Sequence, residues 1–134
     1  MAKVTKSQLD CLARELTMRR VGAVRLDGNT GPWYGTCERC GKRTFLQWCH
    51  FNSRRFLSLR WDGDNACALC SGCHFAWSHH RPGEFTEWMK QRLGMKRYNR
   101  LRLILKTSRR PDYEAIRLAL AKELSSRTAR GSDG

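Results

Sequence analysis

Two Cys-x-x-Cys pairs with a histidine between them are the residues of this chain whose types and spacing point most directly to chemistry. Cys37 and Cys40 form the first pair, Cys70 and Cys73 form the second, and His50 lies between the pairs. Four thiolates in two such pairs suit tetrahedral Zn²⁺, and the intervening segment is long enough to carry a small active site. The spacing predicts a structural zinc ion and makes His50 a candidate functional residue.

A second set of four zinc ligands, or zinc frame, is also possible, because Cys67 and Cys70 are likewise separated by two residues. That frame would keep the first cysteine pair and replace Cys73 by Cys67. We favour Cys70 and Cys73, because Ser71 and Gly72 between them suit a tight turn around a metal ion. Cys67 is then expected to be a small buried apolar side chain.

Composition points to a nucleic-acid partner. The chain has 134 residues, 40% of them hydrophobic, which is enough for one modest core, and its formal net charge is +14. Residues 91–134 contain 12 Lys and Arg against 4 Asp and Glu, which accounts for +8 of that charge. Most of the excess is arginine, which binds phosphate through two parallel hydrogen bonds. A generally basic, soluble protein is the competing interpretation.

The sequence argues against a membrane protein and against a disulfide framework. No apolar run approaches the roughly 20 residues of a spanning helix, and residues 1–7 lack the apolar stretch of a signal peptide. We therefore expect a cytoplasmic protein without membrane partners. Cytosolic thiols stay reduced, so the seven cysteines are better explained by zinc than by disulfides.

Periodicity predicts an α+β chain that is mainly helical. A strand is expected over 44–51, ending near His50, with 56–61 as its antiparallel partner. Residues 65–77 are expected to form a loop that enters a helix, with Cys70 and Cys73 on its first turn. Further helices are predicted over 7–20, 84–93, 96–106 and 112–126, with 22–35 as a loop.

These residues carry a family resemblance. The chain resembles the HNH, or His-Me finger, endonucleases over about residues 33–106, more narrowly the phage recombination proteins of the NinG/Rap type, with a zinc frame like that of endonuclease VII-type resolvases. The resemblance rests on the two cysteine pairs and on His50-Phe51, Ser53-Arg54-Arg55, Leu59-Arg60-Trp61-Asp62, Asn65 and Leu69-Cys70-x-x-Cys73-His74. It implies a zinc-stapled ββα-metal core over 33–83, flanked by an N-terminal helix and loop over 1–32 and basic helices over 84–134, in a single compact domain.

The resemblance also implies hydrolysis of DNA phosphodiester bonds with Mg²⁺ or Mn²⁺, on branched recombination intermediates such as Holliday junctions or D-loops, in the cytoplasm of a phage-infected bacterium. Such hydrolysis needs a base that deprotonates water and a cation that stabilises the developing charge. His50 is the candidate base, because neighbouring arginines favour its neutral form. A homodimer through the terminal helices would supply two active sites for a junction.

Two further residues receive roles from the resemblance. Asn65 would hydrogen-bond the backbone of the loop after His50 and so hold the imidazole in orientation, although an Asx turn or helix cap within 62–65 would also explain it. His74 would bind the catalytic divalent ion. Alternatively it could replace a cysteine in the zinc shell, although four thiolates already complete that shell.

The second ligand of the catalytic ion departs from the family pattern. Related sites often carry Asp or His directly before the base, whereas this chain has Cys49, a soft ligand that suits Mg²⁺ poorly. His79 or His80 could supply the missing ligand, with His79 preferred. Both lie outside the i+4 position relative to His74, so the helix would have to end or distort near residue 78.

Basic side chains on two segments are candidate DNA contacts. Three flank the proposed base and three lie on the predicted helix 96–106, where one face can meet phosphate. They are Arg54, Arg55, Arg60, Lys96, Arg97 and Arg100. Two other functions stay open: a general or sequence-preferring HNH nicking or homing endonuclease, and a zinc-dependent DNA-binding protein without catalysis.

Overall fold

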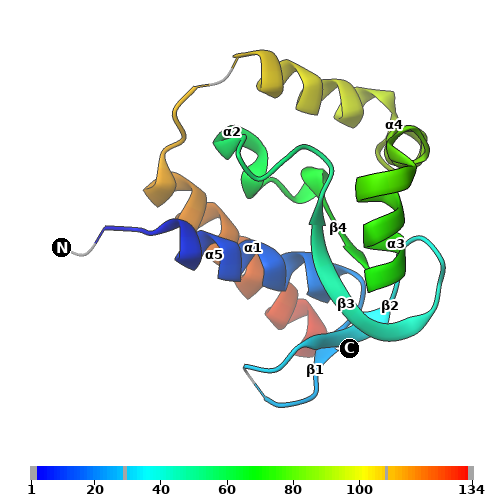
Figure 1. Ribbon diagram of the computed structural model, residues 1–134. Coiled ribbons are helices and arrows are strands. Elements are labelled where there is room, and N and C mark those ends of the chain that lie inside the picture. Colours follow the sequence, from blue (N-terminus) through cyan, green and yellow to red (C-terminus); the bar gives the residue numbers. More distant parts are fainter. Residues whose placement is uncertain (1–2, 29, 108, 133–134) are drawn as a thin grey trace.

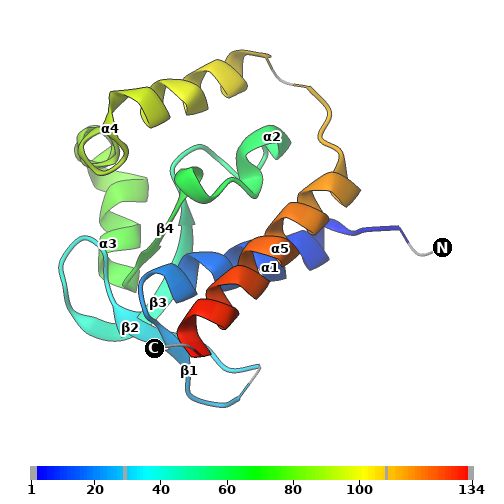
Figure 2. The ribbon, with the colours of Figure 1, turned by 180° about the vertical axis from the view of Figure 1, so that it is seen from behind.

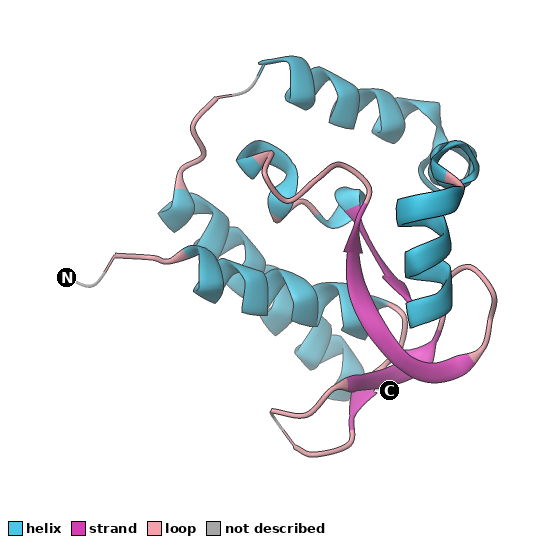
Figure 3. Ribbon diagram, viewed as in Figure 1, coloured by secondary structure: helices cyan, strands magenta, loops and turns pink. Residues whose placement is uncertain are grey.

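The computed structural model describes residues 3–28, 30–107 and 109–132. Helices surround a small antiparallel sheet, so the chain is α+β, as predicted (Figure 3). None of the described helices is both long and apolar enough to cross a membrane. In chain order the elements are α1 (Lys6–Arg20), β1 (Val24–Arg25), β2 (Trp33–Thr36), β3 (Arg43–His50), α2 (Leu57–Arg60), η1 (Gly63–Asn65), β4 (Ala66–Leu69), α3 (Ser71–Phe75), the π-helical turn η2 (Ala76–His80), α4 (Pro82–Thr107) and α5 (Tyr113–Ser132).

The long strand β3 joins all four strands into one antiparallel sheet with the order β1-β2-β3-β4. Its first half pairs with β2 and its second half pairs with β4, where His50 lies opposite Ala66. The strand predicted over 44–51 is confirmed within one residue at each end. The partner predicted over 56–61 is wrong: this segment contains the short helix α2, and β4 pairs with β3 instead.

Side chains of β3 alternate between two differently covered faces of the sheet. Trp48 lies on the face covered by α1, where the guanidinium of Arg14 stacks on its ring at 5.4 Å. Gln47 lies on the other face, where it hydrogen-bonds His74 of α3. His50 is two residues after Trp48 on the same strand, so its side chain lies on the same face, the one covered by α1. His50 and His74 are therefore on opposite faces of the sheet.

Helices α1 and α5 run side by side, and α1 covers one face of the sheet (Figures 1 and 2). Helix α1 begins at a capping box between Thr5 and Gln8, and its apolar stripe packs against Trp61 and Leu120. The predicted helix over 7–20 is confirmed, and α5 continues six residues beyond the predicted end at residue 126.

Gly94 divides α4 into two helices at an angle to each other, because its φ of 76° is non-helical and suits glycine. The two halves correspond to the helices predicted over 84–93 and 96–106. The first half buries Phe85, Met89 and Leu93 in the core beside α3. The second half extends over α2 and η1, as Figure 1 shows.

Candidate metal centre and active site

The two predicted cysteine pairs meet at one point. The ligand atoms of Cys37, Cys40, Cys70 and Cys73 all lie within 4.8 Å of one another. Sγ of Cys40 and Sγ of Cys70 are 3.9 Å apart. A zinc–sulfur distance of about 2.3 Å gives a tetrahedral edge of about 3.8 Å, so these four side chains fit one Zn²⁺ ion. The frame built on Cys70 and Cys73 is confirmed, and Cys67 lies outside it.

Local backbone geometry explains why the cysteines converge. After the first pair, Gly41 adopts a φ of 77°, which turns the chain so that its amide donates to the carbonyl of Cys37 at 3.0 Å. In the second pair, Cys70 is the N-cap residue of α3 and its Sγ accepts a hydrogen bond from the amide of Cys73 at 3.4 Å. Each pair is thus held by a turn that its own sequence encodes.

The electrostatics of the cluster favour a bound cation. Burial alone would raise the pKa of Cys37, but backbone amides of Cys40, Cys70 and Arg39 outweigh it and lower this pKa to about 7. Burial raises the pKa of Cys73 to about 12. A hydrogen bond from Arg39 lowers this pKa, whereas the neighbouring thiols raise it. Four thiolates this close together repel, so a metal ion is required for all of them to ionise.

Cys49 and Cys67 form a separate pair behind the zinc frame. They lie opposite each other on β3 and β4, and they are 1% and 0% exposed. A hydrogen bond with Cys67, together with burial, raises the pKa of Cys49 well above its ordinary value. Cys49 is therefore a neutral, buried thiol, which does not fit the role of a ligand for a hard catalytic cation.

His50 is held at the end of β3 by its imidazole. Its Nε2 donates to the carbonyl of Arg60 at 2.9 Å, and its ring lies 4.3 Å from the ring of Trp48. Burial lowers the pKa of His50 to about 4, and the positive charges of Arg54 and Arg60 act in the same direction. The hydrogen bond to the Arg60 carbonyl acts in the opposite direction but does not outweigh them. The imidazole is therefore neutral at pH 7. Among the described residues Nδ1 has no hydrogen-bond partner, so its lone pair can accept a proton.

Asn65 is fully buried and fastens the loop that follows His50. Its Oδ1 accepts from the amide of Asn52 at 2.8 Å, and its Nδ2 donates to the carbonyls of Asn52 and Leu59, both at 3.1 Å. These bonds connect both ends of the loop to the start of β4. The loop-holding contact predicted for Asn65 is present, and Asp62 rather than Asn65 caps η1.

Asp10 of α1 is a central residue of the site that the sequence analysis missed. It is 7% exposed, and its carboxylate accepts from Arg60 at 3.0 and 2.7 Å, from Arg54 at 3.0 Å and from Trp61 Nε1 at 2.8 Å. The sequence signal for this role of Asp10 was its position: it is a single carboxylate next to Leu9, on the apolar side of a predicted helix. Because Asp10 binds both arginines, the positive charges of Arg54 and Arg60 are partly neutralised.

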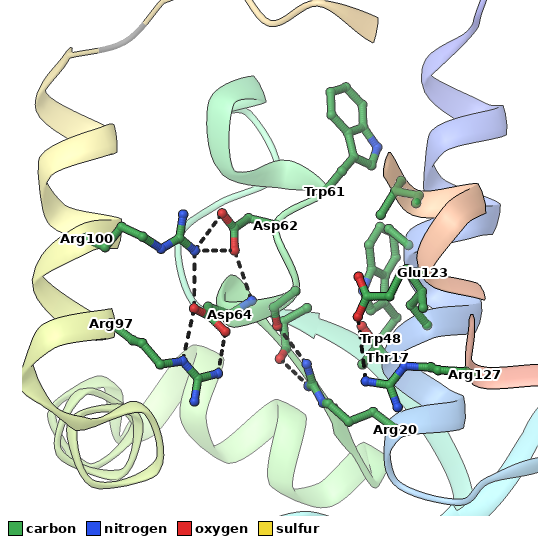
Figure 4. A pocket seen from close by; sticks show the side chains of 15 residues that line it. Thr17, Arg20, Trp48, Trp61, Asp62, Asp64, Arg97, Arg100, Glu123 and Arg127 are labelled. Atoms are coloured by element: carbon green, nitrogen blue, oxygen red, sulfur yellow. Dashed lines mark hydrogen bonds and ion pairs between the residues drawn. The ribbon is translucent and has the colours of Figure 1, made fainter. Parts of the chain in front are cut away.

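The remaining predicted DNA contacts divide into two groups. Arg55 and Lys96 are exposed, and the guanidinium of Arg55 stacks on the ring of Phe56 at 4.9 Å. Arg97 and Arg100 reach from α4 to carboxylates beside η1: Arg97 pairs with Asp64, and Arg100 pairs with Asp62 and Asp64 (Figure 4). Their side chains are about half exposed, so phosphate could still reach them.

The predicted ligands of the catalytic ion lie on the other face of the sheet. His74 Nδ1 donates to Gln47 Oε1 at 2.6 Å, which leaves Nε2 available. The turn η2 is π-helical, which is the distortion that the spacing required, and His74 and His79 line one open pocket of about 510 Å³. His80 does not line this pocket. Within the described ranges, the four zinc-frame cysteines are the only group of three or more His, Cys, Asp or Glu ligands close enough to share an ion.

Comparisons of the chain with protein-family profiles, with characterised proteins and with solved structures find no match. The site is therefore interpreted from its own geometry.

Proposed function

We propose that this chain is a zinc-stabilised, divalent-metal-dependent DNA endonuclease of the HNH, or His-Me finger, type. The observation that carries the proposal is the buried side chain of Asn65, which fastens the loop after His50 while the Arg60 carbonyl orients the imidazole. The order of β3, β4 and α3, with the four-cysteine cluster at the start of the helix, supports a ββα-metal core.

The proposed chemistry begins with a neutral His50. Its Nε2–H is committed to the Arg60 carbonyl, so Nδ1 is the nitrogen that takes a proton from the attacking water. Exposed Arg55, on the loop that Asn65 fastens, would bind a DNA phosphate. A divalent ion, when bound, stabilises the charge that develops on the phosphate and the leaving oxygen. His74 and His79 are the side chains that would hold it, and two imidazoles suit Mn²⁺ better than Mg²⁺.

Branched DNA is the proposed substrate. The chain has a formal net charge of +14, and basic residues of α4, α5 and the loop after His50 contribute to it. Such a charge favours recognition of DNA shape through phosphates, with binding that weakens steeply as salt increases. Holliday junctions and D-loops present phosphates from several directions, which a distributed basic surface can contact together.

A cleavage panel tests the proposal. The zinc-loaded protein is incubated with a four-way junction, a single strand and the matching linear duplex, under Mg²⁺, Mn²⁺ or no added ion. We expect ion-dependent cleavage, strongest on the junction and lost in His50→Ala, which still binds zinc and DNA. His80→Ala is the matched control, because His80 is exposed and outside the proposed site. Near wild-type cleavage by His50→Ala would remove the proposed base.

One observation favours a second candidate, a zinc-dependent DNA-binding protein without hydrolytic activity. The position before His50 is Cys49, which is buried against Cys67, and His74 lies on the opposite face of the sheet from His50. Junction binding with zinc bound, but without cleavage under any ion, would select this alternative.

A further inference from the structure

A cavity of about 260 Å³ lies between α1, α4, α5 and η1 (Figure 4). Four guanidinium groups from three helices surround it: Arg20 from α1, Arg97 and Arg100 from α4, and Arg127 from α5. The ring of Trp48 on β3 forms part of its wall. The cavity is on the α1 face of the sheet, the same face as His50, and none of the predicted metal ligands lines it.

Two hydrogen-bond donors of this cavity lack partners. Nε1 of Trp48 and Nε of Arg127 are buried, and neither has a hydrogen-bond partner. Buried polar groups in folded proteins are nearly always satisfied, so these two atoms indicate a molecule that fills the cavity. Because both atoms can only donate, that molecule must present hydrogen-bond acceptors.

The charges around the cavity favour an anionic acceptor. Three carboxylates, Asp62, Asp64 and Glu123, line it together with the four guanidinium groups, which leaves one positive charge in excess. Arg20 donates to the carbonyls of Gly63 and Ala66 at 2.8 and 2.9 Å. Its carboxylate partner is Glu38 outside the cavity, at 3.8 Å, and Glu38 also pairs with Arg92 at 3.4 Å, so the excess positive charge remains when this pair is included. A phosphoryl group supplies both the negative charge and the acceptor oxygens that this lining lacks.

The position of the cavity suggests where the phosphoryl group comes from. Trp48 forms part of the cavity wall, and its ring lies 4.3 Å from the ring of His50, so the cavity and the proposed base are neighbours on either side of one side chain. We propose that the cavity binds a phosphoryl group of an unpaired DNA strand, next to the phosphodiester presented to His50. The assignment to DNA rests on the proposed function. A single strand is specified because a cavity of this volume cannot hold a duplex.

Calorimetric titration without added divalent ion tests this cavity. The probe is a 5′-phosphorylated single-stranded trinucleotide, compared with the same trinucleotide without phosphate and with inorganic phosphate. We expect the phosphorylated probe to bind at least fivefold more tightly than either comparison ligand. Trp48→Phe keeps an aromatic ring and removes Nε1, and Arg127→Gln removes Nε together with the positive charge. Each should weaken binding about tenfold, because a hydrogen bond to the charged phosphoryl group is lost.

Arg102→Gln is the matched control, because Arg102 is exposed on α4 and outside the cavity. It should change the affinity less than twofold. An equal loss in Arg102→Gln would show diffuse attraction and overturn the proposal, as would equal binding of the two trinucleotides. Inorganic phosphate that binds as tightly as the phosphorylated probe would overturn the assignment to a DNA strand. If Trp48→Phe fails to fold, Arg127→Gln gives the same test.

The assay separates this inference from the proposed endonuclease. It measures binding alone, and His50→Ala should bind the probe as the unmodified protein does. A chain that binds the phosphorylated probe in the cavity but cuts no DNA would refute the endonuclease and keep the cavity. A chain that cuts junctions while Trp48→Phe and Arg127→Gln bind the probe normally would refute the cavity and keep the endonuclease.

Discussion

Replacing Asp10 by asparagine tests how the His50 loop is attached to α1. The substitution keeps the shape of the side chain and removes the charge that binds Arg60, whose side chain is only 16% exposed. Loss of one partner of a buried ion pair costs about 3–5 kcal/mol, whereas the 54% exposed Arg54 adds only about 0–1 kcal/mol. We expect Asp10→Asn to lower the free energy of unfolding by about 3 kcal/mol, because the amide oxygen keeps part of the bonding.

Urea denaturation of the zinc-loaded protein, followed by tryptophan fluorescence, measures this loss. With a slope of about 2 kcal/mol/M, a loss of about 3 kcal/mol moves the unfolding midpoint down by about 1.5 M. Glu114→Gln is the matched control: it breaks the solvent-exposed pair with Arg117 and should leave the unfolding midpoint unchanged. Equal midpoints for the two variants would refute the conclusion that Asp10 fastens the loop through a buried ion pair.

The same variant has a pH signature. Burial alone would raise the pKa of Asp10, but hydrogen bonds from Arg60 and Trp61 outweigh it and hold this pKa below its usual value of 3.8. The carboxylate therefore contributes stability that is fully present above pH ~4 and is lost as the pH falls through the lowered folded-state pKa. Asp10→Asn should lack that part of the acid-induced loss of stability.

Three other substitutions test the metal centre, the loop and the imidazole. Cys70→Ser should lose zinc and unfold at neutral pH, whereas Cys67→Ala should keep one zinc ion per chain by elemental analysis; zinc loss in both variants would contradict the assigned frame. Asn65→Ala removes the hydrogen bonds to the amide and carbonyl of Asn52 and to the carbonyl of Leu59, so it should cost about 2–4 kcal/mol in urea denaturation, while Asn99→Ala on exposed α4 should cost less than about 0.5 kcal/mol. The lowered pKa of His50, about 4 because of burial, means that its contribution to stability is present above pH ~6.5 and is lost as the pH falls toward 4. His50→Gln should flatten the dependence of stability on pH in this window, and an unchanged slope would show that the imidazole titrates normally.

The zinc frame could be predicted from sequence because its information is local. Each cysteine pair closes through a turn within a few residues, and Gly41 supplies the positive φ that the first turn needs. The choice between Cys67 and Cys73 was also decided locally, by the residues available for the second turn. Helices α1 and α4 were predictable for the same reason, since their apolar stripes and the break at Gly94 are visible along the chain.

The partner of β3 could not be read from local pattern. Residues 57–61 alternate apolar and polar side chains as a half-buried strand does, yet they contain α2, which buries Leu59 and is followed by buried Trp61. The true partner, β4, is buried along its whole length and so has no alternation to recognise. Burial of β4 against α1 and α3, rather than β propensity, decides which segment pairs with β3.

The positive charge that is free to bind DNA was the property least predictable from the sequence. Arg60 and Arg100 looked available for phosphate, but Asp10 and Asp62 bind them across 50 and 38 positions of the chain. A carboxylate that distant leaves no local pattern, so the formal charge of +14 overstates the positive charge that is free to meet DNA. Exposed Arg55 and Lys96, which the structure leaves accessible, are better candidates for phosphate contact.

The alternation of β3 sets the main constraint on the chemistry of the site. His74 lies beside Gln47, three residues before His50, which corresponds to about 10 Å along the strand, and it lies on the opposite face. A base and an ion can act on one phosphate only where both faces are accessible. His50 is the last residue of β3, so that place is the open end of the sheet, next to the loop that Asn65 fastens. The catalysis that we propose would therefore require the phosphodiester to pass around this end. Because His50 and His74 are separated by this distance and lie on opposite faces, DNA binding alone does not test whether they act together. Cleavage is therefore the decisive property to measure.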